Sequence, residues 1–152
     1  GVGTLEGGVP GLEEDHFLDD YLCAVATRRT FTEGKPLTWK QLTAYPAIVV
    51  NPGYGVRRSI DRAVQEADAR LQYAFEVSLL TTALAMAASE LGVAVLPHSI
   101  LAHTHYTNLV ARRLVRPTVQ RTTAVVTKTG RSLSPSARAF ADVLKDLFES
   151  PR

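Results

Sequence analysis

The sequence predicts an α/β domain with a mostly parallel sheet. Short apolar runs of strand length alternate along the chain with segments of helical periodicity, the order expected for strands joined by crossover helices. Several of these runs are apolar on consecutive residues, as in strands that are covered on both faces. The chain closes with an amphipathic pattern that begins at Pro135. Together these observations indicate strands packed between helices.

The first elements surround the single cysteine, Cys23. We expect a strand over residues 17–26, where the apolar run predicts burial, so Cys23 is a buried thiol that forms no internal disulfide. Thr38 and Gln41 form a Thr-x-x-Gln capping box, in which each side chain satisfies a backbone donor of the other residue. A short helix is therefore expected there. Residues 47–50 then predict a buried strand.

The middle of the chain predicts two helices and a strand between them. Residues 51–55 have turn chemistry, and an apolar stripe predicts a helix over 56–69. Apolar and polar residues alternate over 71–77, the period expected of a strand with one wet face. Residues 79–91 are apolar nearly all round, as in a buried helix, and Gly92 is expected to end it in a left-handed conformation.

The remaining elements are short until the last. We expect strands over 93–96, 109–115 and 120–128, a short helix over 99–105, and a final helix after Ser134. The apolar residues that mark the buried face of this helix are Ala137, Phe140, Ala141, Leu144, Leu147 and Phe148. At the start of the chain, residues 1–4 predict the end of a buried strand, with no charged or polar residues before it. We therefore expect a fragment of a longer protein.

Composition bounds the classes of function. The 152 residues are 45% hydrophobic and 21% charged, as in an ordinary globular domain. The formal net charge of +2 is too small for this chain alone to hold DNA or a membrane surface by bulk charge. The longest apolar stretch is about half of what a membrane span needs. The lone cysteine and the lack of a secretory segment favour a cytoplasmic protein.

Five segments together resemble the C-terminal part of the effector-binding domain of LysR-type transcriptional regulators. They are residues 17–25, 35–42, 48–55, 89–97 and 131–140. Each pattern alone is common in α/β proteins, but their order and spacing along most of the chain are much more specific.

The resemblance implies a periplasmic-binding-protein-like fold of type 2 with two α/β subdomains, the first incomplete in this chain. Residues 1–26 would end the first subdomain, 27–96 would form the second, and 97–152 would return to the first. In such a bacterial regulator a small, often carboxylate-bearing effector binds between the subdomains and modulates DNA binding by an N-terminal helix-turn-helix. The expected partners are the effector, further copies of the chain in a homodimer or homotetramer, and DNA only through that missing domain. No cofactor and no membrane are expected.

The expected site lies at the carboxyl ends of strands, where loops and helix N-termini present N–H groups to polar or anionic ligands. Three such junctions occur, at residues 51–56, 78–82 and 96–100. The resemblance implies that they line the effector cleft, with a further residue facing them from the first subdomain. The candidate effector-binding residues are Thr4, Pro52, Tyr54, Gly55, Ser78, Leu79, Pro97 and Ser99.

Several of these residues have a second interpretation. Ser78 and Ser99 also suit helix N-caps, and Tyr54 suits an exposed turn as well as a pocket wall. The four arginines near the predicted helix over 56–69 are either a solvated basic face or the surface that meets a partner chain. They are Arg57, Arg58, Arg62 and Arg70.

The sequence leaves one alternative function. A solute-binding protein of a transport system has the same fold and stays as the alternative. No enzyme is expected, because no paired catalytic constellation or nucleophile elbow appears. The histidines His98, His103 and His105 lack the spacing of a metal site, so no metal is expected.

Overall fold

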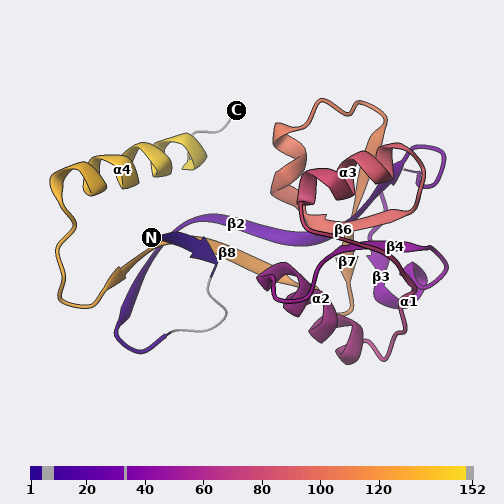
Figure 1. Ribbon diagram of the computed structural model, residues 1–152, viewed down its shortest axis with the longest axis horizontal. Coiled ribbons are helices and arrows are strands. Elements are labelled where there is room, and N and C mark those ends of the chain that lie inside the picture. The colour runs from indigo at the N-terminus through magenta and orange to yellow at the C-terminus, as the bar shows by residue number, and fades with distance from the viewer. Residues whose placement is uncertain (5–8, 33, 150–152) are drawn as a thin grey trace. The chain divides into compact units, whose positions relative to one another are not determined.

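The chain forms two compact units. The computed structural model describes residues 1–4, 9–32 and 34–149. Unit 1 comprises Gly1–Asp20 and Gln120–Arg152, and unit 2 comprises Tyr21–Val119. Figure 1 shows the chain with its elements labelled. The expected subdomain boundaries after residues 26 and 96 stay a prediction.

A sheet forms the centre of unit 2. Its strands lie in the order β3-β7-β2-β6-β4-β5. Their bounds are Leu12–Thr27 (β2), Leu37–Thr38 (β3), Ala47–Val50 (β4), Tyr73–Val77 (β5), Val93–Pro97 (β6) and Leu109–Val115 (β7). The strand β4 is parallel to β5 and β6, but β2 is antiparallel to both β6 and β7. The strand β3 is parallel to β7, so the expected parallel order is broken only by β2, which makes the sheet mixed.

Helices cover both faces of this sheet (Figure 1). On one face lie α1 (Trp39–Leu42) and α2 (Gly55–Glu66), and on the other lie α3 (Leu80–Ala88) and the 3₁₀ helix η1 (His98–His103). Alternate residues of one strand accordingly enter different apolar clusters. In β2, Leu22 and Ala24 pack with α1 and α2, whereas Cys23 packs with α3. The expected burial of Cys23 is confirmed, and its Sγ donates to Leu96 O at 3.3 Å.

Unit 1 contains a small antiparallel ribbon and the last helix. The strand β1 (Val2–Thr4) pairs with β8 (Gln120–Lys128), which neighbours β2 in the strand order. The helix α4 (Pro135–Glu149) begins as expected, with Ser134 Oγ accepting a hydrogen bond from Ala137 N at 3.3 Å. Among the described residues, no helix is both long and apolar enough to cross a membrane.

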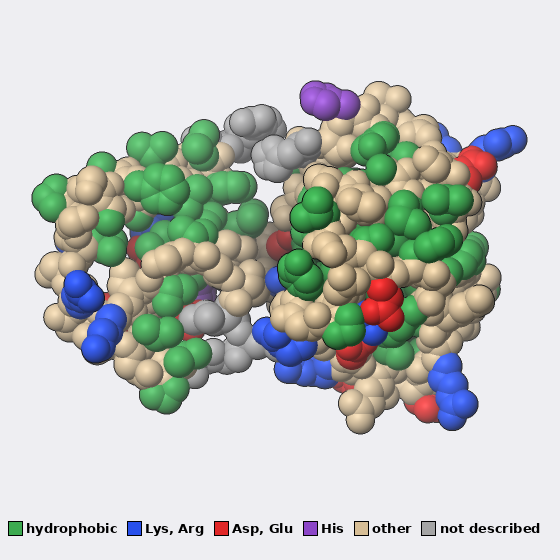
Figure 2. Space-filling view, in the orientation of Figure 1, with side chains coloured by type: hydrophobic (Ala, Val, Ile, Leu, Met, Phe, Trp, Pro, Cys, Tyr) green, Lys and Arg blue, Asp and Glu red, His purple; other side chains and the backbone are tan. Residues whose placement is uncertain are grey.

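The buried face of α4 was predicted only in part. Ala141 is buried, but Phe140 and Leu147 are 61% and 58% exposed. Together with Val143, these two side chains form an exposed apolar stripe at helical spacing. In the space-filling view, hydrophobic side chains are accordingly visible over α4 (Figure 2).

Most element boundaries agree with the sequence, and three features differ. The strand β2 begins at Leu12, so the charged stretch before Phe17 belongs to it. The helix α2 ends at Glu66 and not at residue 69, because Asp68 adopts a positive φ of 47°. The predicted wet-face alternation of β5 fails at Phe75, which is 39% exposed.

Gly92 does not end α3 in a left-handed conformation, so this prediction is wrong. The left-handed residue after α3 is Glu90, with φ 59°, and α3 itself ends at Ala88. Gly92 is required for a different reason: a Cβ there would lie 2.6 Å from Pro46 O, closer than real Cβ atoms approach backbone. The glycine therefore permits close approach of two chain segments and does not turn the chain.

Candidate functional site

The carboxyl ends of β4, β5 and β6 meet at one edge of unit 2. In the register of the parallel strands, Val50 lies beside Val77, and Asn51 N donates to Val77 O at 2.9 Å. On the other side of β4, Ile48 lies beside Ala94 of β6, so the ends of all three strands point the same way. The three junctions predicted from the sequence thus occur at a single sheet edge, which we call the carboxyl edge.

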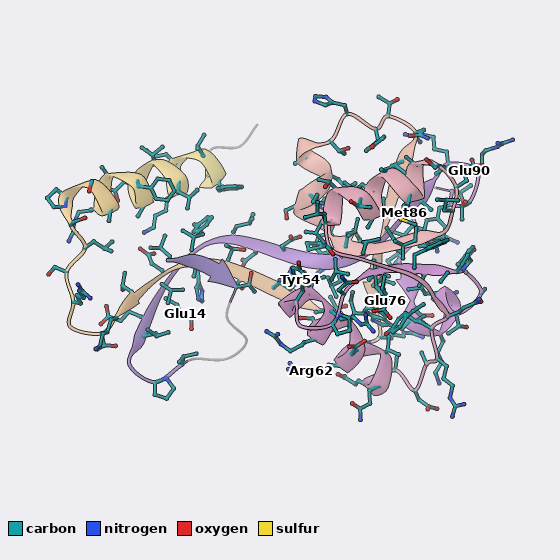
Figure 3. The ribbon with its side chains drawn as sticks, viewed as in Figure 1. Glu14, Tyr54, Arg62, Glu76, Met86 and Glu90 are labelled. Carbon is teal, nitrogen blue, oxygen red and sulfur yellow. The ribbon has the colours of Figure 1, made fainter. Side chains whose placement is uncertain are left out.

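The first junction leads from β4 into α2. Pro52 and Tyr54 are exposed, and Gly53 adopts a positive φ of 99° that turns the chain. Tyr54 is the N-cap of α2 and Gly55 is its first residue, with no side chain capping the backbone N–H groups. Figure 3 shows Tyr54 at the start of this helix. The first-turn N–H groups of α2 are therefore left for another acceptor.

The second junction corrects the expected N-cap of α3. The N-cap is Leu79, which has no side-chain cap hydrogen bond, and not Ser78. The Ser78 Oγ instead accepts a hydrogen bond from Asn51 Nδ2 at 3.0 Å. This bond joins the first two junctions, and it leaves the Ser78 hydroxyl proton directed elsewhere. Leu79 beside it is 61% exposed.

The third junction follows β6. Pro97 is the last residue of β6 and is buried, and it also forms the N-cap of η1. Ser99 lies inside η1 and is half-buried. It is therefore not the N-cap that the sequence suggested. Seven of the eight predicted site residues thus belong to the three junctions of unit 2.

Thr4 belongs to unit 1. It ends β1, where its Oγ1 lies 3.4 Å from Thr123 Oγ1 of β8. Whether Thr4 takes part in the same site stays a prediction.

Arg57 anchors α2 beneath the carboxyl edge. Its Nη1 donates to Val50 O at 3.0 Å and to Glu76 Oε2 at 2.9 Å, and its Nε donates to Asp61 Oδ1 at 2.9 Å. Its guanidinium also lies 4.5 Å from the centre of the Tyr73 ring. Arg57 is buried, so the interpretation of all four arginines as a solvated or partner-facing surface is wrong for this one.

The same network shifts two pKa values. Burial alone would lower the pKa of Arg57, but hydrogen bonds and charge attraction from Glu76 and Asp61 outweigh it, and the pKa is raised. Burial, followed by the hydrogen bond that the Tyr73 hydroxyl donates to Asp61 Oδ1 at 2.8 Å, raises the pKa of Tyr73 to about 12. Arg57 therefore stays charged and Tyr73 stays neutral.

Three residues of the carboxyl edge were missed as site residues. They are Asn51, Arg57 and Arg58. Asn51 had a sequence signal, because a polar residue directly after a buried strand is placed at the sheet edge. Arg57 is buried and Arg58 is exposed, and the sequence contains no signal for this difference, because only packing decides which of two adjacent arginines is buried.

Two cavities lined by described residues, each within a single unit, lie elsewhere. One, of about 570 Å³, lies between the start of β2, the end of β8 and α4, and the other, of about 450 Å³, is lined by residues that include Lys40, Glu66 and Arg116. None of the eight predicted residues lines either cavity. In the part of the chain that the structure describes, no three His, Cys, Asp or Glu side chains gather into a metal-binding group.

One curated protein matches part of this chain. A curated relative from Escherichia coli K12, described as an uncharacterized HTH-type transcriptional regulator, YbhD, is 29% identical over 110 residues. Those residues are 72% of this chain but only 35% of YbhD, so the chain spans about a third of that protein.

Two solved structures share the fold. The regulatory domain of CcmR from Synechocystis PCC6803, in complex with 2-PG, has a TM-score of 0.82 at 17% identity, over 98% of this chain and 73% of that one. The effector-binding domain of QuiR, in complex with shikimate, has a TM-score of 0.75 at 18% identity, over 97% and 70%. The expected fold class, that of a type 2 periplasmic-binding-protein-like effector domain, is confirmed.

The strongest link is at the level of sequence. The family profile described as the LysR substrate binding domain matches residues 1–149, which confirms the resemblance over nearly the whole chain. The chain therefore belongs to the LysR substrate-binding domain family.

Proposed function

We propose that this chain is the effector-sensing part of a bacterial, cytoplasmic LysR-type regulator, and that it binds a small carboxylate-bearing molecule at the carboxyl edge. The ligand would lie against Pro52, Tyr54 and Gly55 on one side and against Ser78 and Leu79 on the other. Pro97, Ser99 and Thr4 complete the proposed set. Family membership favours this function over transport, because YbhD is described as a transcriptional regulator.

The observation that carries the proposal is the convergence of unused donors at one sheet edge. Two helices, α2 and α3, begin there without a side chain capping their N–H groups. Such helix ends favour negative charge, because aligned peptide dipoles leave a partial positive charge at the N-terminus. Ser78 adds a hydroxyl donor, since its oxygen already accepts from Asn51. Shikimate, which QuiR binds, is itself a carboxylate, and this supports the ligand class.

The ligand can change the DNA binding of the protein only if it binds two conformations of the protein with different affinities. A ligand shifts an equilibrium by no more than the difference in its affinity for the two conformations. We propose that the two states differ in the angle between the two subdomains, and that a homodimer or homotetramer transmits the change to N-terminal helix-turn-helix domains.

Thermal denaturation of the 152-residue chain with a series of carboxylates tests the site. Shikimate, benzoate and succinate are suitable probes, and a bound probe raises the melting temperature by mass action. Loss of one hydrogen bond to a charged group weakens binding about tenfold, so Ser78→Ala is expected to reduce affinity for the bound probe to roughly that extent.

Ser89→Ala is the matched control. Ser89 is exposed and follows the opposite end of α3, so its removal is expected to leave affinity unchanged. If no carboxylate raises the melting temperature, or if the Ser78 and Ser89 variants bind a probe equally well, the proposed site is wrong.

A further inference from the structure

Two adjacent arginines in the first turn of α2 have opposite surroundings. Arg57 is buried and donates to two carboxylates, Glu76 and Asp61. Arg58 is exposed, and within the described residues it is paired with no carboxylate. The charge of Arg57 is therefore matched inside the fold, whereas that of Arg58 is not.

The side chain of Arg58 folds back over the first junction of the carboxyl edge. Its Nη1 donates to Gly53 O at 3.0 Å. Its Nη2 lies 3.6 Å from the point where a Cβ on Gly55 would stand, and no side chain at Gly55 covers it. The guanidinium thus lies beside Gly53 and Gly55, the second of which is proposed to bind the effector, and among the described residues it is held by a single hydrogen bond.

This position is electrostatically unusual for a cation. A positive side chain in the first turn of a helix is repelled by the positive end of the helix dipole, and acidic residues are normally preferred there. The first turn of α2 contains no acidic residue. Arg58 therefore adds positive charge where the backbone already provides it, and one hydrogen bond leaves most of its five N–H donors unused.

We propose that Arg58 selects an oxyanion group on the effector. This inference rests on the function proposed above, and it names the residue that makes the site prefer an acid over a neutral molecule of the same shape. A guanidinium fork matches the paired oxygens of a carboxylate or a phosphate. The shared chemistry is an oxyanion with two acceptor oxygens on one face.

The test compares acids with their neutral esters. Binding of shikimate, benzoate and inorganic phosphate, and of methyl shikimate and methyl benzoate, is measured through the amide resonances of Asn51 and residues 53–55 in the 152-residue chain. The acids are expected to bind more tightly than the esters. Comparing phosphate with the carboxylates shows which of the two oxyanions the site prefers. Arg58→Gln is expected to weaken acid binding about tenfold or more, because a hydrogen bond between charged groups is lost. It is expected to leave ester binding unchanged.

Two further variants separate the charge of Arg58 from the shape of its guanidinium group, and its local effect from that of a charge elsewhere on the chain. Arg58→Lys keeps the charge without the fork, so its acid affinity is expected to lie between those of the wild type and Arg58→Gln. Arg70→Gln makes the same charge change at an exposed position beyond the other end of α2 and is expected to alter acid affinity less than about twofold. Raising the salt concentration is expected to weaken acid binding to the wild type but much less to Arg58→Gln.

The outcomes distinguish this inference from the proposed function. If acids bind at residues 51–55 and Arg58→Gln binds them as tightly as the wild type does, the site stands and the role of Arg58 is wrong. Equal binding of acid and ester by the wild type overturns that role too. If no probe shifts these amides, the proposed function fails, and the role of Arg58 fails with it.

Discussion

At the scale of single residues, the network around Arg57 holds two strands and a helix together. The guanidinium contacts the last residue of β4, Glu76 of β5 and Asp61 of α2 (Figure 3 labels Glu76). Removing a buried charge that has several partners leaves those partners unsatisfied, which costs more than the net value of the pairs.

Arg57→Met is therefore expected to lower the free energy of unfolding by about 2 kcal/mol, as measured by urea denaturation. The value is below that of a fully buried ion pair, because Glu76 and Asp61 are partly exposed to water. Arg70→Met removes an exposed arginine and is expected to change stability by less than about 0.5 kcal/mol. Equal effects of the two substitutions would contradict the anchoring role of Arg57.

Tyr73 makes stability depend on pH in the alkaline range. Its folded pKa of about 12 lies above the unfolded value of 10.0. A raised pKa means that folding favours the protonated phenol, so this stabilisation is fully present below pH 10 and is lost as the pH rises toward 12. Urea denaturation between pH 9 and about 12 is expected to show a steeper loss of stability for the wild type than for Tyr73→Phe. Parallel curves would mean that Tyr73 ionises normally.

At the scale of elements, Gly92 determines how closely α3 and β6 approach the start of β4. Gly92→Ala places a methyl group 2.6 Å from Pro46 O and 3.2 Å from Ile48 Cγ1, so backbone must move. The free energy of unfolding is expected to fall by about 2 kcal/mol or more, within the range for overpacking. Gly3→Ala is the matched control, because nothing lies within 4 Å of its added Cβ. A Gly92 variant as stable as the Gly3 variant would refute the close approach.

The apolar stripe on α4 has a measurable consequence. Phe140, Val143 and Leu147 expose more than half of their surface on one side of the helix. The 152-residue chain is expected to bind a hydrophobic dye and to self-associate as its concentration rises, and Val143→Lys with Leu147→Lys is expected to reduce both. Leu91→Lys, at an exposed leucine of unit 2, is the control for light scattering and dye fluorescence. Similar effects from the control would show that the stripe has no special role.

Local chemistry explains which elements could be predicted. The capping box at Thr38 forms as expected, with both reciprocal hydrogen bonds, because it depends on residues three apart. The strands β4, β7 and β8 have the predicted bounds. The antiparallel pairing of β2 with β6 could not be predicted, because strand direction depends on contacts between residues far apart in the chain. The same holds for the hydrogen bond between Asn51 and Ser78, which lie in different junctions.

At the scale of the whole molecule, the two units differ in their share of the core. Both apolar clusters lie in unit 2, whereas unit 1 contributes only Ala124, Val125 and Ala141 to the buried hydrophobic residues of the described chain. Stability is therefore expected to be uneven.

Hydrogen exchange followed by mass spectrometry measures this difference. Amides of β4 and β6 are expected to exchange at least about tenfold more slowly than those of β1 and α4, because opening unit 2 exposes far more apolar surface. Substitutions in unit 1, such as Ala141→Gly, are expected to speed exchange in α4 and leave β4 unchanged. Uniform protection across the chain would mean that the units unfold together.

The division of unit 1 between both ends of the chain also sets an order of assembly. Gly1–Asp20 contact Gln120–Arg152, and the whole of Tyr21–Val119 lies between them in sequence. Bringing two distant segments together costs chain entropy, and a folded unit 2 shortens the effective loop that must close. During synthesis on the ribosome, residues 1–20 therefore cannot form their contacts within unit 1 until β8 and α4 have been synthesised. A stall in translation within unit 2 would leave β1 without its partner strand β8, and an unpaired strand edge is prone to aggregation.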